Sequence, residues 1–102
     1  MEEDIVFVQS VLEVRIKILR RGLSYIYQKH PELDNQSAVI QECLKNANEI
    51  WTSKQNKSVF LYYKRVNQKY ICVVCKHYNG EGFLITAYFT YKLQGDKKVW
   101  TK

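Results

Sequence analysis

The chain has 102 residues, of which 46% are hydrophobic and 25% charged, with one proline and four glycines. This is enough for one domain with a real core and too little for two, and the composition excludes a disordered or fibrous chain, so we expect a single domain over residues 1–102. No apolar run approaches the roughly 18 residues of a membrane span, and the acidic start at Met1–Asp4 is unlike a secretory signal. We therefore expect a cytoplasmic protein that does not bind membranes.

One strand and two helices are predicted in the first half. Residues 11–19 alternate apolar and charged side chains, which is typical of a half-buried strand. After Gly22 an apolar stripe at helical spacing runs to Pro31, where the helix should end because the residue before a proline avoids the helical conformation. A second helix should begin near Asp34 or Asn35, either of which can cap it. The stripes are Leu23, Ile26, Tyr27 and His30 in the first helix, and Ile40, Cys43, Leu44 and Ala47 in the second.

The second half is predicted to be extended. Three runs rich in β-formers cover residues 59–65, 70–77 and 83–90, and Val99 with Trp100 predicts a short final strand. Their short connections, residues 66–68 and 78–82, are rich in turn formers, so consecutive strands should pair antiparallel. The fold class expected is α+β: an antiparallel β-meander sheet with an N-terminal strand and two helices packed on one face.

Alternation assigns each residue of these strands to a face. A five-residue loop over residues 78–82 would pair His77 with Phe83, and the same register sets Val74 against Thr86. The side expected under the helices carries Ile71, Val73 and Cys75 on one strand and Phe83, Ile85, Ala87 and Phe89 on the next. The opposite, open side is expected to carry Cys72, Val74, Lys76, Leu84, Thr86, Tyr88 and Thr90. For residues 59–65 the turn leaves two choices: either Tyr62 with Lys64, or Tyr63, reaches the open side.

The charge is strongly polarised along the chain. Residues 52–102 hold ten lysines and arginines against two acids, a net charge of +8, whereas residues 1–51 hold six against eight, a net charge of −2. Six of the eight tyrosines also lie in the basic half. Surfaces that stack bases and attract phosphates have this composition, which favours RNA as a partner. A solvated basic sheet with ordinary cross-strand tyrosines is the alternative.

Few residues can carry chemistry. Cys72 and Cys75 would point to opposite faces of a strand, so the three cysteines are expected to be free thiols, and neither a metal nor a cofactor is expected. His77 is expected to be structural. His30, the last residue of a helical stripe, can reach the rim of the sheet and act as a proton acceptor; a structural role is its alternative. Together with Lys76 and Thr86 as anion stabilisers it would suit a reaction that needs no metal.

The chain also resembles the phage-type branch of the barnase, EndoU, colicin and RelE-like nuclease superfamily. The resemblance spans residues 14–92 and implies a small α+β fold and metal-independent RNA cleavage by a toxin-type or phage-encoded enzyme. The segments that carry it are Val14-Arg15-Ile16, Lys29-His30-Pro31-Glu32-Leu33, Asn48-Glu49-Ile50-Trp51, Leu61-Tyr62-Tyr63, Val73-Val74-Cys75-Lys76, Asn79-Gly80 with Gly82-Phe83, and Ile85-Thr86-Ala87-Tyr88 with Thr90 and Lys92.

These observations predict an endoribonuclease that cleaves RNA by attack of a 2′-OH. His30 would be the general base, and Lys76 and Thr86 would stabilise the phosphate. Binding of the RNA is expected from Tyr62, Tyr63, Lys64, Tyr88 and Lys92. An acidic antitoxin or immunity protein could cover the same basic face. The alternative is a catalytically inactive RNA-binding or protein-interaction module on the same fold.

Overall fold

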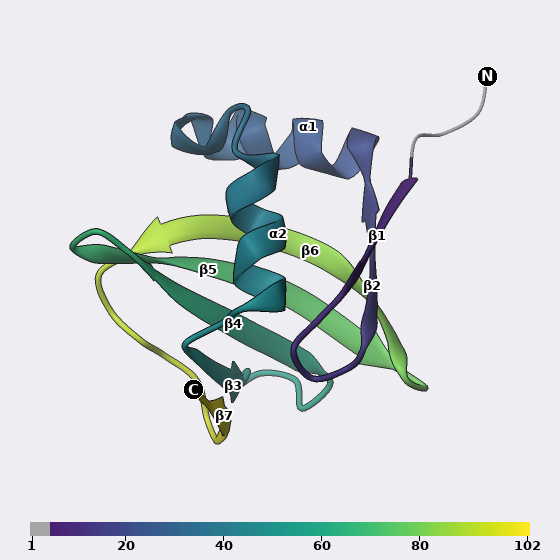
Figure 1. Ribbon diagram of the computed structural model, residues 1–102, viewed down its shortest axis with the longest axis vertical. Helices are drawn as coiled ribbons and strands as arrows, with labels where there is room; N and C mark the ends of the chain where they lie inside the picture. The colour runs from purple at the N-terminus through teal and green to yellow at the C-terminus, as the bar shows by residue number, and fades with distance from the viewer. Residues whose placement is uncertain (1–4) are drawn as a thin grey trace.

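A seven-stranded, mostly antiparallel sheet forms the scaffold, and two α-helices pack on one of its faces, which is the expected α+β class (Figure 1). The computed structural model describes residues 5–102. The order of strands across the sheet is β1-β2-β6-β5-β4-β3-β7. The strands are β1 (Ile5–Gln9), β2 (Arg15–Leu19), β3 (Glu49–Thr52), β4 (Val59–Val66), β5 (Lys69–Tyr78), β6 (Glu81–Thr90) and β7 (Lys98–Thr101).

The sheet is not a simple meander. Strands β4, β5 and β6 are consecutive antiparallel neighbours as predicted, but β2 lies parallel to β6 on its far side. Two strands, β1 and β3, were not predicted. The strand predicted over residues 11–19 is β2, and it begins at Arg15 because a turn with Glu13 at φ 62° precedes it. The short final strand β7 is confirmed and pairs with β3.

Helix α1 (Arg20–Lys29) follows β2 without a linker, and α2 (Ser37–Lys45) crosses the face formed by β4 and β5 (Figure 1). The predicted end of the first helix is confirmed: Pro31 begins a separate 3₁₀ turn, Pro31–Leu33. The predicted start of the second helix is wrong, since Gln36 precedes α2 and no side chain caps it. Asn35 instead adopts a left-handed conformation with φ 61° in the connection.

A bulge in β6 changes the predicted faces. Tyr78 pairs with Glu81 across a two-residue turn, Asn79-Gly80, in which both residues have positive φ, as such tight hairpins require. His77 therefore pairs with Gly82, not with Phe83. After Leu84 the register shifts by one residue, so the predicted pair of Val74 with Thr86 is present, and Cys72 pairs with Tyr88.

The extra residue of this bulge is Ile85, and its presence reverses three predicted positions. Phe83 and Ile85, expected under the helices, are 46% and 43% exposed. Leu84, expected on the open side, packs against the main core instead. Beyond the bulge, Ala87 is buried in that core as expected.

The main core lies between the helices and the sheet. Ile26 of α1 and Ile40, Cys43 and Leu44 of α2 are buried, which confirms the two helical stripes. They pack against strand residues that include Ile16, Ile18, Ile71, Val73 and Cys75. Burial of this apolar surface is the main force that holds the helices on the sheet.

The opposite face of the sheet is partly covered by the connection between β6 and β7. The Tyr63 hydroxyl donates to the carbonyl of Gln94 (3.0 Å) and accepts from its backbone N–H (2.9 Å), and Leu93 packs beside it. Cys72 and Val74 are therefore buried in a second, smaller core, although they were expected on an open face. Only part of this face remains available to a partner.

Candidate functional site

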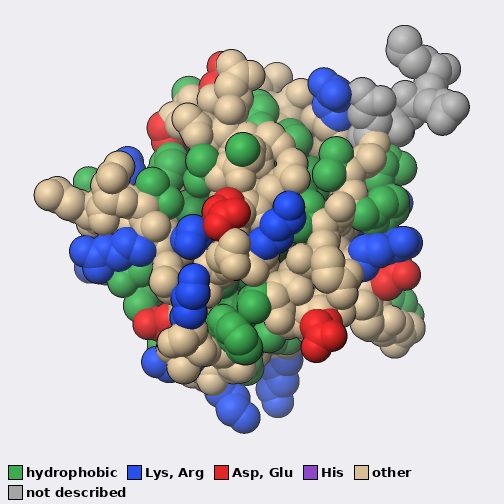
Figure 2. All heavy atoms as spheres, in the orientation of Figure 1, with side chains coloured by type: hydrophobic (Ala, Val, Ile, Leu, Met, Phe, Trp, Pro, Cys, Tyr) green, Lys and Arg blue, Asp and Glu red, His purple; other side chains and the backbone are tan. Residues whose placement is uncertain are grey.

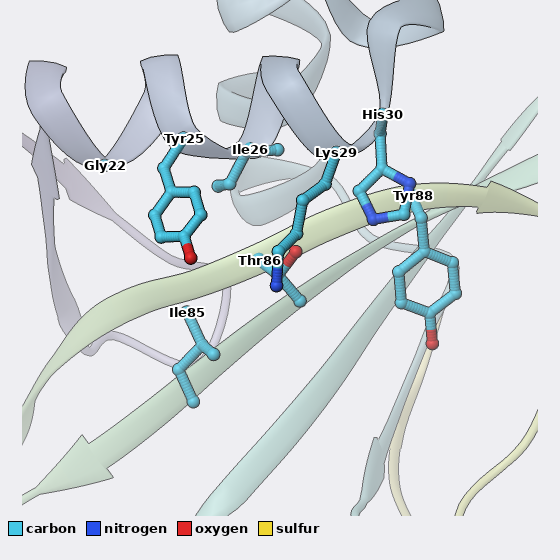
Figure 3. A pocket seen from close by; sticks show the side chains of 8 residues that line it. All are labelled: Gly22, Tyr25, Ile26, Lys29, His30, Ile85, Thr86 and Tyr88. Carbon is cyan, nitrogen blue, oxygen red and sulfur yellow. The ribbon is translucent and has the colours of Figure 1, made fainter.

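A pocket of about 550 Å³ lies between α1 and the edge of β6 (Figure 3). The topology creates it: β2 pairs with β6 only through Arg15, Ile16 and Lys17, and the chain then leaves the sheet at Leu19 to form α1. Along the rest of this edge, β6 faces α1 and not another strand. This α1–β6 pocket is lined by Gly22, Tyr25, Ile26, Lys29, His30, Ile85, Thr86 and Tyr88.

His30 lies at one end of the α1–β6 pocket. Its backbone N–H donates to the carbonyl of Ile26 (2.8 Å), which fixes it as the residue that ends α1. Its Nδ1 is 3.8 Å from a carboxylate oxygen of Glu32, and its ring centroid is 6.0 Å from that of Tyr88. Figure 3 shows the imidazole directed from the helix toward β6. With Nδ1 beside Glu32, Nε2 is the ring nitrogen left for a bound molecule.

Lys29 is the cation of this pocket, and it was not predicted as a site residue. Its Nζ lies 5.2 Å from the centroid of the Tyr25 ring, and its side chain descends from α1 toward Thr86 (Figure 3). The available signal was its position directly before His30 at the exposed end of an amphipathic helix.

Thr86 and Tyr88 reach the same pocket from β6. Being two residues apart on one strand, they share the face opposite Ala87, as alternation predicted. Burial raises the pKa of Tyr88, whose hydroxyl interacts with the Cys72 thiol, so the phenol stays protonated at neutral pH. Its hydroxyl points away from His30, so Tyr88 presents its ring to the pocket (Figure 3).

The three predicted lysines are not brought together in this pocket. Lys76 pairs with Phe83 and lines a neighbouring hollow with Lys17. Lys64 pairs with the buried Ile71 and donates from Nζ to the carbonyl of Asn46 (3.2 Å), so it lies on the helix side of the sheet. Lys92 is exposed in the connection after β6. None of the three lines the α1–β6 pocket.

Two predicted RNA-binding tyrosines are buried. Tyr62 belongs to the main core and Tyr63 to the second core, and each is at most 1% exposed. Of the two alternatives left open for residues 59–65, Tyr63 is the one on the face away from the helices. The connection after β6 covers its ring, so no ring surface remains for a base. Burial raises the pKa of both hydroxyls.

His77, unlike His30, is held by a stacked ring and a short hydrogen bond. Its ring stacks on Phe60 with a centroid distance of 4.0 Å, and its Nε2 is 2.9 Å from the Tyr62 hydroxyl, which in turn donates to Ser10 Oγ (3.0 Å). Burial lowers the pKa of His77 to about 4. With its ring stacked and its Nε2 occupied, His77 has a structural role.

The cysteines are free and buried, and burial raises the pKa of each thiol. Within residues 5–102, no group of three or more His, Cys, Asp or Glu side chains is arranged so that it could hold a metal ion. The same stretch contains no helix that is both long and apolar enough to cross a bilayer.

No family matches. Comparison of the chain with protein-family models, curated proteins and solved structures gives no similar protein. The function must therefore be inferred from the geometry of the α1–β6 pocket itself.

Figure 2 shows basic and acidic side chains interspersed on the face of the molecule that carries α2.

Proposed function

We propose that this protein is an endoribonuclease that cleaves RNA at the α1–β6 pocket with its own side chains as catalysts. The observation that carries the proposal is the convergence of a partly exposed imidazole, a cation and a hydroxyl on one pocket: His30, Lys29 and Thr86. A general base beside anion stabilisers is what phosphodiester cleavage by an internal hydroxyl requires.

In the proposed reaction Nε2 of His30 accepts the proton of a ribose 2′-OH. The 2′-oxygen then attacks the adjacent phosphorus, the bond from phosphorus to the 5′-oxygen breaks, and the leaving oxygen takes up a proton from water. Lys29 and Thr86 donate to the non-bridging oxygens, where negative charge grows in the transition state. The products are a 2′,3′-cyclic phosphate and a 5′-hydroxyl.

Glu32 and Tyr88 have supporting roles in this scheme. The Glu32 carboxylate beside Nδ1 orients the imidazole and stabilises the imidazolium that forms when Nε2 is protonated. The ring of Tyr88 flanks His30, with 6.0 Å between the ring centroids. Lys29 takes the role that sequence reasoning assigned to Lys76, because it lines the same pocket as His30 and Lys76 does not.

The experiment is to incubate the purified protein, in EDTA, with two labelled oligoribonucleotides that differ only in one 2′-deoxy substitution. We expect cleavage of the all-ribose strand at that position, with a 2′,3′-cyclic phosphate end, and no cleavage there in the substituted strand, because the nucleophile is missing.

Cleavage at the deoxy position, or products with a 5′-phosphate, would contradict attack by the 2′-OH. Binding of both strands without any product would favour the alternative, an inactive RNA-binding module.

A further inference from the structure

A row of alternating aromatic and basic side chains crosses the sheet beside the α1–β6 pocket. In the register of β1, β2, β6 and β5, Phe7 pairs with Lys17, Lys17 with Phe83, and Phe83 with Lys76. Paired residues of neighbouring strands lie on the same face. Because Val8, Ile16 and Cys75, their chain neighbours, belong to the main core, this row lies on the face away from the helices. We call Phe7, Lys17, Phe83 and Lys76 the basic–aromatic row.

The row is open to solvent. Phe7 and Phe83 are 48% and 46% exposed, far more than aromatic rings that serve only a core. The bulge at Ile85 explains why Phe83 is exposed. Without the extra residue, the alternation of β6 would direct this ring under the helices. Bulges commonly re-aim side chains next to functional sites.

Hollows in the surface connect the row to the α1–β6 pocket. A small hollow lined by Lys17, Gly22 and Phe83 shares Gly22 with that pocket. A larger hollow, lined by Lys17, Lys76, Tyr78 and Phe83, adjoins it through Lys17 and Phe83. Phe83 and Tyr88 pair with Lys76 and Cys72, which are four residues apart on β5, so they are separated by roughly 13 Å at about 3.3 Å per residue. A chain of several nucleotides can span this path.

The charge along the path suits a polyanion. Lys29, Lys17 and Lys76 line it, and none of them is ion-paired with a carboxylate of residues 5–102. Glu81 is the one acidic side chain among the linings of the three hollows, and it lies 3.8 Å from Arg15. Unpaired lysines next to exposed rings are the arrangement that binds single-stranded nucleic acid, by phosphate attraction and base stacking.

We infer that the basic–aromatic row is a subsite for single-stranded RNA, which holds the nucleotides next to the one cleaved at His30. This rests on the proposed function for the identity of the ligand. A base stacks on Phe83, and its flanking phosphates lie against Lys17 and Lys76. Double-stranded RNA does not fit, because its bases are stacked on one another and cannot reach the ring.

The experiment measures binding and not cleavage, by fluorescence anisotropy with uncleavable 2′-O-methyl oligonucleotides of two and eight residues. Replacing Phe83 by Ala should weaken binding of the octamer at least about fivefold, since one stacked base contributes about 1–3 kcal/mol. Lys17→Ala and Lys76→Ala should each reduce the salt slope of octamer binding by about 0.7. Binding of the dinucleotide should not change in any of the three.

Two control variants distinguish loss of stacking from loss of folding, and loss of a specific lysine from a general loss of positive charge. Phe83→Leu keeps an apolar side chain without a ring, and it should lose affinity as Phe83→Ala does while unfolding at the wild-type temperature. Lys45→Ala removes an exposed lysine at the end of α2, on the other side of the sheet, and should bind like wild type.

Octamer binding that is unaffected by Phe83→Ala and Lys17→Ala would overturn the inference. Equal losses of affinity for the dinucleotide and the octamer would also overturn it. Binding of polyglutamate with the same dependence on these residues would overturn it too, and would indicate an acidic protein as the partner. If the octamer binds as expected but RNA is never cut, the subsite stands and the proposed catalysis fails. If short RNA is cut but length has no effect on affinity, the catalysis stands and the subsite fails.

Discussion

At the scale of single residues, the two histidines show how environment decides role. His77 is half-buried, stacked on Phe60 and hydrogen-bonded to Tyr62, which belongs to the main core. His30 has a side chain that is 31% exposed, with Glu32 at 3.8 Å and an open pocket on its other side. Sequence reasoning could separate them because one follows a helix and the other ends a strand.

His77 should make stability depend on pH. Its pKa is about 4 in the folded protein, against 6.5 for an ordinary histidine, so between these values the unfolded chain binds the extra proton and the folded one does not. The free energy of unfolding should therefore fall as pH falls from 6.5 toward 4. Urea unfolding at several pH values should show a shallower fall for His77→Gln, which keeps a donor for Tyr62 but does not titrate. Identical pH profiles of the two proteins would contradict burial of a neutral His77.

Other residues could not be assigned from sequence. Tyr62 and Tyr63 occur in a basic, aromatic segment, and composition alone suggested RNA contacts. Alternation put one of them on each face but could not show that the connection after β6 folds back and covers Tyr63 through Gln94. Lys29 was missed because its role depends on how α1 lies against β6, which is a tertiary arrangement.

At the scale of elements, predictions succeeded where the signal is local. Helical stripes, the stop at Pro31 and the three long strands all follow from spacing and turn residues within a few positions. The bulge at Ile85 gives no such signal, because Phe83 to Phe89 alternates without interruption in the sequence. Only the tight Asn79-Gly80 turn, combined with the pairing of Val74 and Thr86, demands an extra residue. The parallel contact of β2 with β6 likewise joins residues far apart in the chain.

The start of β6 depends on Gly82. A Cβ at this position would lie 2.6 Å from the carbonyl oxygen of Lys76 and 2.9 Å from Ile16 Cδ1, with no room to move against backbone. Gly82→Ala should therefore lower the free energy of unfolding by about 1–3 kcal/mol, as overpacking does. Gly22→Ala is the matched control: its nearest atom would be 3.9 Å away, so in α1 it should raise stability by up to about 1 kcal/mol. Chemical unfolding of both variants measures this, and equal effects would contradict the close approach of β2, β5 and β6.

At the scale of the whole molecule, the polarised charge of the sequence is distributed differently from the simplest expectation. The strand lysines do not all line one face, since Lys64 lies on the helix side and Lys76 on the other. The proposed RNA path instead combines cations from both halves of the chain: Lys17 and Lys29 come from the acidic half. Counting charge by halves therefore does not identify the residues that line the proposed path.

The proposed enzyme depends on the gap that the topology leaves beside β6. Because β2 continues directly into α1, the helix end carrying His30 is brought to a strand edge that would otherwise be paired. The basic–aromatic row extends the same site across the sheet. Catalysis and binding are thus assigned to one continuous surface, which runs from the end of α1 to β5.

Single-turnover cleavage of a short RNA by wild type, His30→Ala and Gln28→Ala tests this account most directly. Gln28 is an exposed residue of the same helix outside the pocket lining, so its replacement controls for changes to α1. We predict that Gln28→Ala cleaves at the wild-type rate, whereas His30→Ala is folded but at least about 10²-fold slower, because a general base contributes about 10² to 10⁴. Equal rates for a folded His30→Ala protein and wild type would contradict the assignment of the α1–β6 pocket as the catalytic site.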